Sequence, residues 1–363
     1  MTQIVSDRRA LHRIPELEWQ LPKTSEYVKQ ALKGLNCRVF SPVDTAVCAF
    51  FDFGGEKTIA FRADMDGLPI TEKTGVPYAS NHPGAMHACG HDGHMAILLE
   101  LARRLSEKKT LPHNVLLIFQ PAEESPGGAK IICDTGLLEQ YRVQAVFGLH
   151  LWPGLTAGQV FSRVEELMSR SSEVNVDIYG KSAHIAKSAE GLDAVMAGCE
   201  FYRRAMELER SLPKQVYRLL KFGKFHSGTA RNALSDHTCL EGSLRAFQDE
   251  IFDSLREGLY RVAGEVQAET GCTVEITMSS GYPAILNPKD ICRRVAEAVG
   301  YGLIPEPSMT SEDFSWYQKH VPGMFFFLGL GDVPALHTDN FDFDETILEK
   351  GADFFEALAE NFR

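Results

Sequence analysis

The sequence of 363 residues predicts an α/β fold, with a mostly parallel sheet in one domain and a smaller domain inserted into it. Two patterns predict this fold class. Short apolar runs typical of buried parallel strands alternate with helices along most of the chain. Between residues 172 and 280 the strands instead alternate apolar and polar positions, as half-exposed strands do. The length also favours about two domains, because single cores rarely grow beyond roughly 250–300 residues.

The larger domain is expected to hold residues 1–171 and 281–363. Its first part predicts two helices separated by a break at Pro15, the second ending near Gly34. Strands are predicted in "AVCAFFDF", "KTIAFRADMD", "NVLLIFQPAEES" and "AVFGLHLWP", and helices in "MAILLELARRLSEKK" and "AKIICDTGLL". After the insertion, "GMFFFLGLG" predicts a core strand and "ETILEKGADFFEALAENF" predicts a closing helix.

The inserted domain, residues 172–280, follows the order strand, helix, strand, strand, helix, strand. Its strands are predicted in "SSEVNVDIYG", "YRLLKFGKFHSG", "HTCLEGSLRAF" and "TVEITMSS". Its helices are predicted in "GLDAVMAGCEFYRRAMELERSL" and "DEIFDSLREGLYRVAGEVQAETG". This βαββαβ order describes a ferredoxin-like domain.

Composition and charge exclude several classes of protein. The net charge of −12 argues against nucleic-acid and anionic-membrane partners, because phosphate groups would be repelled. No apolar run approaches the roughly 18 residues of a membrane helix. The N-terminus lacks the basic-then-apolar order of a signal peptide, so a cytoplasmic location is expected. The eight cysteines are expected to be thiols, mostly in the core, with disulfides as the minor alternative.

Metal-binding residue types gather at the ends of the predicted strands. In an open parallel sheet, ligands bind at the carboxyl ends of the strands. Thiolate, imidazole and carboxylate groups together suit zinc or another first-row divalent ion. The strand ends and the turns after them hold more such groups than one ion needs, which predicts two ions. The residues are Asp64, Asp66, Cys89, His91, Glu123, Glu124, His150 and His337.

Most of these residues, and the nearby His94, have a plainer explanation when each is taken alone. Cys89 fits an ordinary buried thiol, His91 a helix cap, and His94 a residue of the first helical turn. The remaining alternatives are a solvated turn for Glu123 and Glu124, loop positions for His150 and His337, and a strand-end turn for Asp66.

The adjacent glutamates predict a hydrolytic site. At the end of a strand, successive side chains point in different directions. One glutamate can therefore bind an ion while its neighbour lies beside a water that the ion activates. A carboxylate within hydrogen-bond reach of such a water can take its proton.

Nine motifs are spread over nearly the whole chain. They are "LHRIPELEWQ", "AFRADMDGLPI", "MHACGHDGHMA", "FQPAEES", "GLHLWP", "GKSAHIA", "GTARNALSDHTCLEGSLRAF", "TSEDFSWY" and "ALHTDNF". In combination, these motifs resemble those of one family, the co-catalytic metallopeptidases that include aminoacylase and carboxypeptidase G-type enzymes (peptidase family M20). The chain looks closest to the branch of hippurate hydrolases, auxin-conjugate amidohydrolases and N-acetyl-diaminopimelate deacetylases.

The resemblance implies a zinc-exopeptidase-like catalytic domain with two divalent ions, zinc or manganese, or else cobalt or nickel. It implies that Glu123 is the general base and acid and that Asp66 steadies a metal ligand. Cys89 falls where related branches have a bridging aspartate. The implied ligands are Cys89, His91, Glu124, His150 and His337.

For the inserted domain, the resemblance implies a lid through which many members form homodimers. His184 in "GKSAHIA" resembles a lid histidine that reaches the partner's site and polarises the scissile carbonyl. Asn232 and Arg245 match positions associated with the carboxylate end of the substrate. A turn position for Asn232 and a surface ion pair for Arg245 are the alternatives. The stretch around His184 departs from the glycine-rich form usual in the branch, and a common proline is missing after it.

These implications predict a metal-dependent amidohydrolase that cleaves the amide bond of N-acyl amino acids. The first alternative is a dipeptidase or aminopeptidase-like exopeptidase of the same family. The second is a metal-binding protein without turnover. A third, a redox enzyme built on Cys89, lacks a nearby resolving cysteine.

Overall fold

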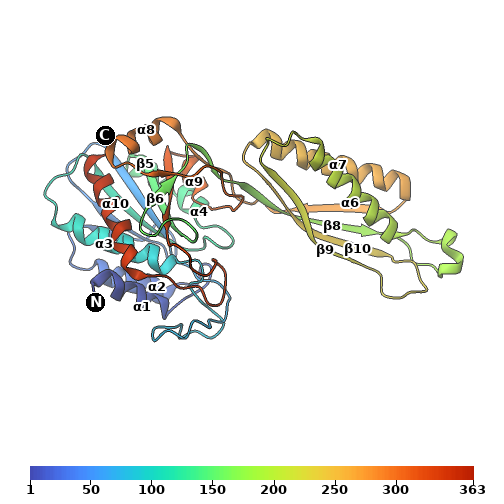
Figure 1. Ribbon diagram of the computed structural model, residues 1–363, viewed down its shortest axis with the longest axis horizontal. Coiled ribbons are helices and arrows are strands. Elements are labelled where there is room, and N and C mark those ends of the chain that lie inside the picture. The colour runs from blue at the N-terminus through green and yellow to red at the C-terminus, as the bar shows by residue number, and fades with distance from the viewer. The chain divides into compact units, whose positions relative to one another are not determined.

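The computed structural model describes residues 1–363 and divides into two compact units (Figure 1). The first unit contains Met1–Leu167, Leu286–Glu306 and Glu312–Arg363, and the second contains Met168–Ile285 and Pro307–Ser311. The strand and helix pattern of the sequence gives no sign that residues 307–311 group with the second unit. None of the helices is both long and apolar enough to cross a membrane.

The first unit is built on an eight-stranded sheet of order β1-β2-β4-β3-β5-β14-β6-β13. The four central strands β4, β3, β5 and β14 run parallel, whereas β2 and β6 run against β4 and β14. The prediction of a mostly parallel sheet is therefore confirmed. The strands are β1 (Arg38–Phe40), β2 (Val47–Phe51), β3 (Thr58–Asp64), β4 (Asn114–Gln120), β5 (Val143–Trp152), β6 (Val160–Ser162), β13 (Gly302–Leu303) and β14 (Gly323–Gly329).

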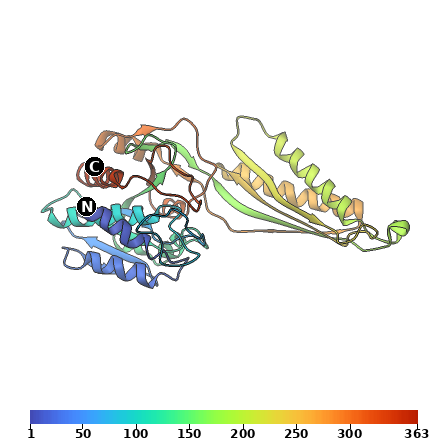
Figure 2. The same ribbon diagram turned by 60° about the horizontal axis from the view of Figure 1, so that its bottom comes forward.

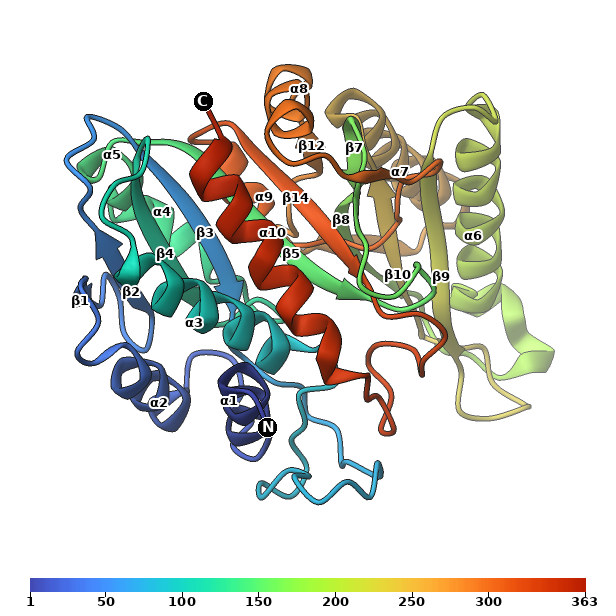
Figure 3. The ribbon, with the colours of Figure 1, turned by 60° about the vertical axis from the view of Figure 1, so that its left-hand side comes forward.

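Helices cover both faces of this sheet (Figure 3). On one face, apolar side chains of the strands form the core with α1 (Gln3–His12), α2 (Pro22–Leu32), α3 (His91–Glu107), α8 (Lys289–Ala298) and α10 (Leu348–Asn361). The other face holds α4 (Ala129–Asp134), α5 (Leu137–Gln140) and α9 (Ser315–Gln318). The segment "AKIICDTGLL" forms two short helices, because Gly136 between them has a left-handed φ of 75°.

The second unit is an antiparallel sheet of order β11-β8-β10-β9, covered on one face by two helices (Figure 2). Val174, Val176 and Ile178 are buried in its core, while the residues between them are more exposed, which explains the alternating pattern in the sequence. The elements are β8 (Arg170–Tyr179), α6 (Ala194–Ser211), β9 (Arg218–Ser227), β10 (His237–Ala246), α7 (Asp249–Thr270) and β11 (Thr273–Met278). A separate two-stranded sheet pairs β7 (Glu165–Met168) with β12 (Ile285–Asn287).

Candidate metal centre

The first unit brings all five predicted metal ligands together. Cys89 and His91 lie at the start of α3, His150 lies in β5, Glu124 follows β4, and His337 is in the loop after β14. Two sets of three ligand atoms each lie within 4.8 Å of one another. One set is Cys89, His91 and His150, and the other is Cys89, Glu124 and His337. Because the thiol belongs to both sets, the arrangement suits two ions that share Cys89.

The separations between the ligand atoms fit metal coordination. Two ligands bound to one tetrahedral ion at about 2.0–2.3 Å lie roughly 3.3–3.7 Å apart. The Sγ atom of Cys89 is 3.3 Å from Nε2 of His150 and 3.3 Å from Nε2 of His337. The same His337 nitrogen is 3.3 Å from Oε1 of Glu124.

Hydrogen bonds to the backbone orient two of the imidazoles. Nδ1 of His91 donates to the carbonyl of Asp66 at 2.8 Å, and Nδ1 of His150 donates to the carbonyl of Leu151 at 2.7 Å. When neutral, each ring therefore carries its lone pair on Nε2, the atom that lies among the other ligand atoms. Nε2 of His91 and Oε1 of Glu124 are buried and make no hydrogen bond. Buried polar atoms without partners are rare, so these residues fit a bound cation.

The charge of the site also favours cations. Burial works to lower the pKa of His91, but the carboxylates of Asp64 and Asp66 raise it to about 10. Burial and then the carboxylate of Glu124 raise the pKa of the Cys89 thiol well above its usual range. Bound divalent ions would reverse the local field and permit a thiolate.

His94 is not placed as a metal ligand, although it lies close to His91 and Asp64. Its Nδ1 is 2.6 Å from Oδ1 of Asp64, and its Nε2 accepts the backbone N–H of Leu151 at 2.9 Å. Both ring nitrogens are therefore occupied by the protein.

A buried arginine, Arg62, lies in a cluster of carboxylates beside the metal centre. This cluster contains Glu123, Glu312 and Asp313. Arg62 lies 3.0 Å from Glu312 and 2.7 Å from Asp313, and its Nη1 donates to Asp64 at 2.7 Å. Sequence reasoning missed these partners of the site. The available signal was Arg62 itself, because a charged residue inside an apolar strand requires buried partners.

The two glutamates sit in a turn that Asp66 holds by its carboxylate. The backbone N–H groups of Glu123 and Glu124 donate to Oδ1 and Oδ2 of Asp66 at 3.0 and 3.1 Å. Asp66 was predicted to steady a metal ligand, and its carboxylate accepts these two hydrogen bonds from the backbone of the glutamates. The Glu123 carboxylate lies within 4.8 Å of the ligand atoms of His91 and Glu124. Burial and then the carboxylates of Glu312 and Glu124 raise the pKa of Glu123 well above its usual range.

The same turn closes tightly at Gly128, which supplies a testable prediction. A Cβ atom on Gly128 would lie 1.9 Å from the carbonyl oxygen of Pro121, so Gly128→Ala must displace the turn. We expect a loss of about 1–3 kcal/mol in stability and weaker metal binding, measured by denaturation and by metal titration. Gly264→Ala is the matched control, because its Cβ would meet nothing within 4 Å, and it should retain both properties. Unchanged metal binding in Gly128→Ala would contradict this role of the turn.

The start of α3 is fixed by a buried ion cluster that includes the histidine of "LHRIPELEWQ". Asp92, next to His91, accepts from Arg8 at 2.9 Å and lies 2.7 Å from Nδ1 of His12. Nε2 of His12 is 3.3 Å from Glu72. Burial works to lower the pKa of His12, but Asp92 and then Glu72 raise it to about 9. The charged imidazole therefore stabilises the folded chain.

We expect this stabilisation to depend on pH. The ordinary pKa of histidine is about 6.5, so the contribution of His12 is complete below pH 6.5 and is lost as pH rises through 9. The stability difference between the unsubstituted protein and His12→Gln should shrink by about 3 kcal/mol between pH 6 and 9.5. Urea denaturation followed by fluorescence measures it in the first unit, which holds Trp19, Trp152 and Trp316. A difference that stays constant with pH would contradict this account.

The remaining predicted residues lie in the second unit. His184 is bridged to Ala233, and the N–H of Ile185 donates to the carbonyl of Asn232 at 2.9 Å, so His184 and Asn232 are neighbours. Arg245 lies near the other end of β10, about 25 Å of strand away. Its guanidinium donates to Ser243 and to the carbonyl of Met309. Asn232 and Arg245 of one chain therefore cannot bind the same small carboxylate.

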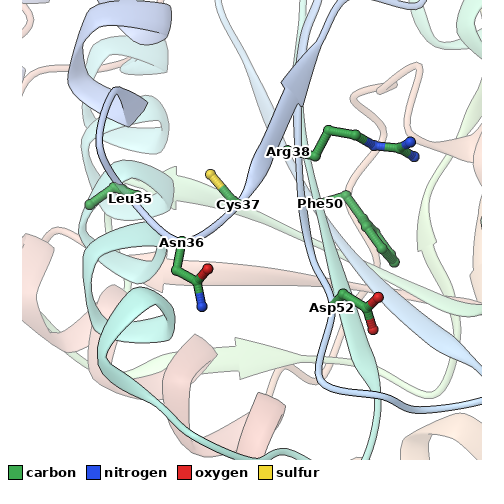
Figure 4. Close-up of a pocket in the computed structure, with 6 residues that line it drawn as sticks. All are labelled: Leu35, Asn36, Cys37, Arg38, Phe50 and Asp52. Carbon is green, nitrogen blue, oxygen red and sulfur yellow. The ribbon is translucent and has the colours of Figure 1, made fainter.

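A pocket of 590 Å³ lies at the edge of the sheet beside β1 (Figure 4). None of the predicted site residues lines it. Its lining residues are Leu35, Asn36, Cys37, Arg38, Phe50 and Asp52.

Comparison with known proteins identifies the family of the chain. Residues 60–361 match the model of peptidase family M20/M25/M40. The chain is 33% identical over 374 residues to an uncharacterized hydrolase from Staphylococcus haemolyticus (strain JCSC1435), covering 99% of this chain and 98% of that one.

Two solved structures extend the comparison. The YXEP protein of Bacillus subtilis, described as a dinuclear metal binding peptidase from the M20 family, is similar with a TM-score of 0.86 and 30% identity over 98% of this chain and 96% of that one. The aminopeptidase PepT from Bacillus cereus shares the fold, with a TM-score of 0.76 at 18% identity over 99% of this chain and 97% of that one. This chain therefore belongs to peptidase family M20/M25/M40 and is a hydrolase that acts on amide bonds.

Proposed function

We propose that the protein is a dinuclear metal-dependent amidohydrolase that removes the acyl group from N-acyl amino acids. The position of Glu123 is the observation that supports this best. Its carboxylate lies beside the candidate ligands His91 and Glu124, and its backbone is held in place by Asp66. A metal site with a purely structural role needs no such carboxylate, which argues against a protein that only binds metal.

The ions, zinc or manganese or else cobalt or nickel, would supply Lewis acidity toward the substrate carbonyl and the attacking water. Glu123 accepts a proton from that water as the water oxygen bonds to the amide carbon. Glu123 then gives the proton to the nitrogen of the leaving amino acid as the C–N bond breaks. The acid product keeps the second proton of the water until that proton passes to the amine, so the final products are a carboxylate and an ammonium group, and Glu123 returns to its starting state.

The substrate class is supported by the motifs, which resemble those of hippurate and N-acetyl-diaminopimelate hydrolases. The description of the B. subtilis relative as a peptidase favours exopeptidase activity as the second candidate. A panel of N-acetyl and N-benzoyl amino acids and dipeptides, tested with metal-loaded protein, separates the two. Hydrolysis confined to dipeptides would support the second candidate, and no hydrolysis of any of them would contradict both.

We further propose that the second unit is a lid that forms a homodimer. Its edge strand β9 has no neighbour on one side. Phe225 on β9 and three side chains of α6 are exposed apolar groups, at 40–58% exposure, and would be covered by a second copy. The three are Val195, Met196 and Tyr202. Light scattering should give the mass of a dimer, and Met196→Glu with Phe225→Lys should give a monomer.

The separation of Asn232 and Arg245 supports a site that uses two chains. We propose that His184 from one chain donates an N–H to the substrate carbonyl at the metal centre of its partner. His184→Ala should then lose turnover and keep its metal. Mixing His184→Ala chains with Glu123→Gln chains should restore part of the activity, because one site of each mixed dimer has both residues. Mixed dimers without activity would contradict action across the interface.

A further inference from the structure

His94 lies one turn of α3 after His91 and is 3% exposed. Its two ring nitrogens have different partners. Nδ1 lies 2.6 Å from Oδ1 of Asp64, and Nε2 lies 2.9 Å from the backbone nitrogen of Leu151. Neither partner belongs to the two sets of ligand atoms that share Cys89, although the ring itself packs against His150 with the centroids 4.6 Å apart.

These partners leave one protonation state for the ring. The backbone N–H of Leu151 can only donate, so Nε2 of His94 must carry a lone pair. The ring proton is then on Nδ1 and is donated to Asp64. Nη1 of Arg62 holds the other oxygen of Asp64 at 2.7 Å, which fixes the acceptor.

The backbone of Leu151 links this ring to the metal centre. Its N–H is bound by His94, while its carbonyl accepts from Nδ1 of His150. That second bond leaves Nε2 of His150 beside the Cys89 thiol, 3.3 Å away. A displacement of Leu151 would therefore displace the imidazole of His150.

Two glycines make this contact possible. A Cβ atom on Gly93 would lie 2.6 Å from Cδ1 of Leu151, and one on Gly90 would lie 3.2 Å from it. Strand β5 therefore approaches the start of α3 closely enough for His94 to reach the N–H of Leu151. The run from residue 90 to 94, "GHDGH", thus contains the candidate ligand His91. It also contains Gly90, Gly93 and His94, which together fix the position of Leu151 beside the second candidate ligand, His150.

We propose that His94 is a positioning residue, which holds the candidate ligand His150 in place through the backbone of Leu151 as a neutral ring protonated on Nδ1. The proposal rests on the metal centre of the proposed function and is independent of the substrate.

Cobalt binding without substrate tests this role directly. The full-length protein and His94→Ala are titrated with Co²⁺ against a chromogenic chelator, while visible absorption reports the coordination. His94→Ala should weaken one of the two binding steps by about 10–100-fold, as loss of such supporting bonds does. Imidazole added to the solution should fill the space left by the removed ring and restore that binding step. The matched control is 1-methylimidazole, which binds cobalt as well but has no N–H for Asp64, and it should fail.

Two further variants keep the test decisive. Gly93→Ala retains His94, but its Cβ would lie 2.6 Å from Cδ1 of Leu151 and within 3.2 Å of Phe343 and Leu348. The leucine side chain is crowded there, so we expect the substitution to shift the strand, to weaken the same step and not to respond to imidazole. His94→Gln offers both a donor and an acceptor and should retain more affinity than His94→Ala. The proposal is wrong if folded His94→Ala and Gly93→Ala bind cobalt as the unsubstituted protein does, or if both imidazoles rescue equally. If the unsubstituted protein bound cobalt and the variants weakened that binding as expected, but no substrate were hydrolysed, the proposed function would be wrong and the role of His94 would stand.

Discussion

Glu123→Gln is expected to retain its metal and to lose roughly 10²–10⁴-fold in turnover, the range that loss of proton transfer produces. The amide has nearly the shape of the carboxylate but cannot take a proton from water. The Glu123 backbone N–H, bound to Asp66, is unaffected by the change. Elemental analysis and hydrolysis of the best substrate measure the two properties on the same sample.

Glu124→Gln is the matched control, because it makes the same chemical change at the next residue. Its carboxylate oxygen lies 3.3 Å from His337, among the candidate ligand atoms. This variant should therefore bind metal more weakly and should recover turnover in excess metal better than Glu123→Gln does. If the two variants had the same metal content and the same residual turnover, the division of roles between the glutamates would be wrong.

Cys89→Ala has the second large expected effect, because Cys89 belongs to both sets of ligand atoms. Removing a shared ligand weakens both sites, so the metal content should fall from two ions per chain to one or none. Turnover should fall with it. The count is measured by elemental analysis after reconstitution with excess metal and removal of unbound ions.

A second buried cysteine separates this effect from simple loss of packing. Cys48 is fully buried in β2 of the same unit and is absent from both sets of ligand atoms. Cys48→Ala should cost stability yet keep two ions per chain. Full metal content in Cys89→Ala, or a ceiling of one ion in the unsubstituted protein, would contradict the proposed centre.

The long elements could be predicted from the sequence because they rest on local patterns. The buried runs of β3, β4, β5 and β14 differ from the alternating β8, and each of these patterns spans seven to ten residues. The gathering of metal-binding residue types follows from the rule that polar residues at strand ends meet at one edge of a sheet, whereas the five candidate ligands among them follow from the resemblance to the family. The short strands β1, β6, β7, β12 and β13 were not predicted, because two to four residues carry too little periodicity.

The supporting residues were missed for a different reason. Arg62 contacts Glu312 and Asp313, about 250 positions later in the chain, and no local pattern pairs them. The role of His94 depends on a backbone N–H of β5, and an N–H is present at every residue except proline. Contacts of this kind depend on how α3 and β5 pack, which the sequence pattern does not encode.

The place of β14 in its sheet has a consequence for the order in which the chain can fold during synthesis. Strand β14 lies between β5 and β6, although it leaves the ribosome after the whole stretch Met168–Ile285. At about 5–20 residues per second, roughly 2–9 s pass between the emergence of Ile285 and that of Gly329. During this interval nearly all residues of the second unit have been synthesised. In the first unit, the edges of β5 and β6 that later pair with β14 are still unpaired. A chain stalled before β14 would lack His337 and would offer the edge of β5 to other chains.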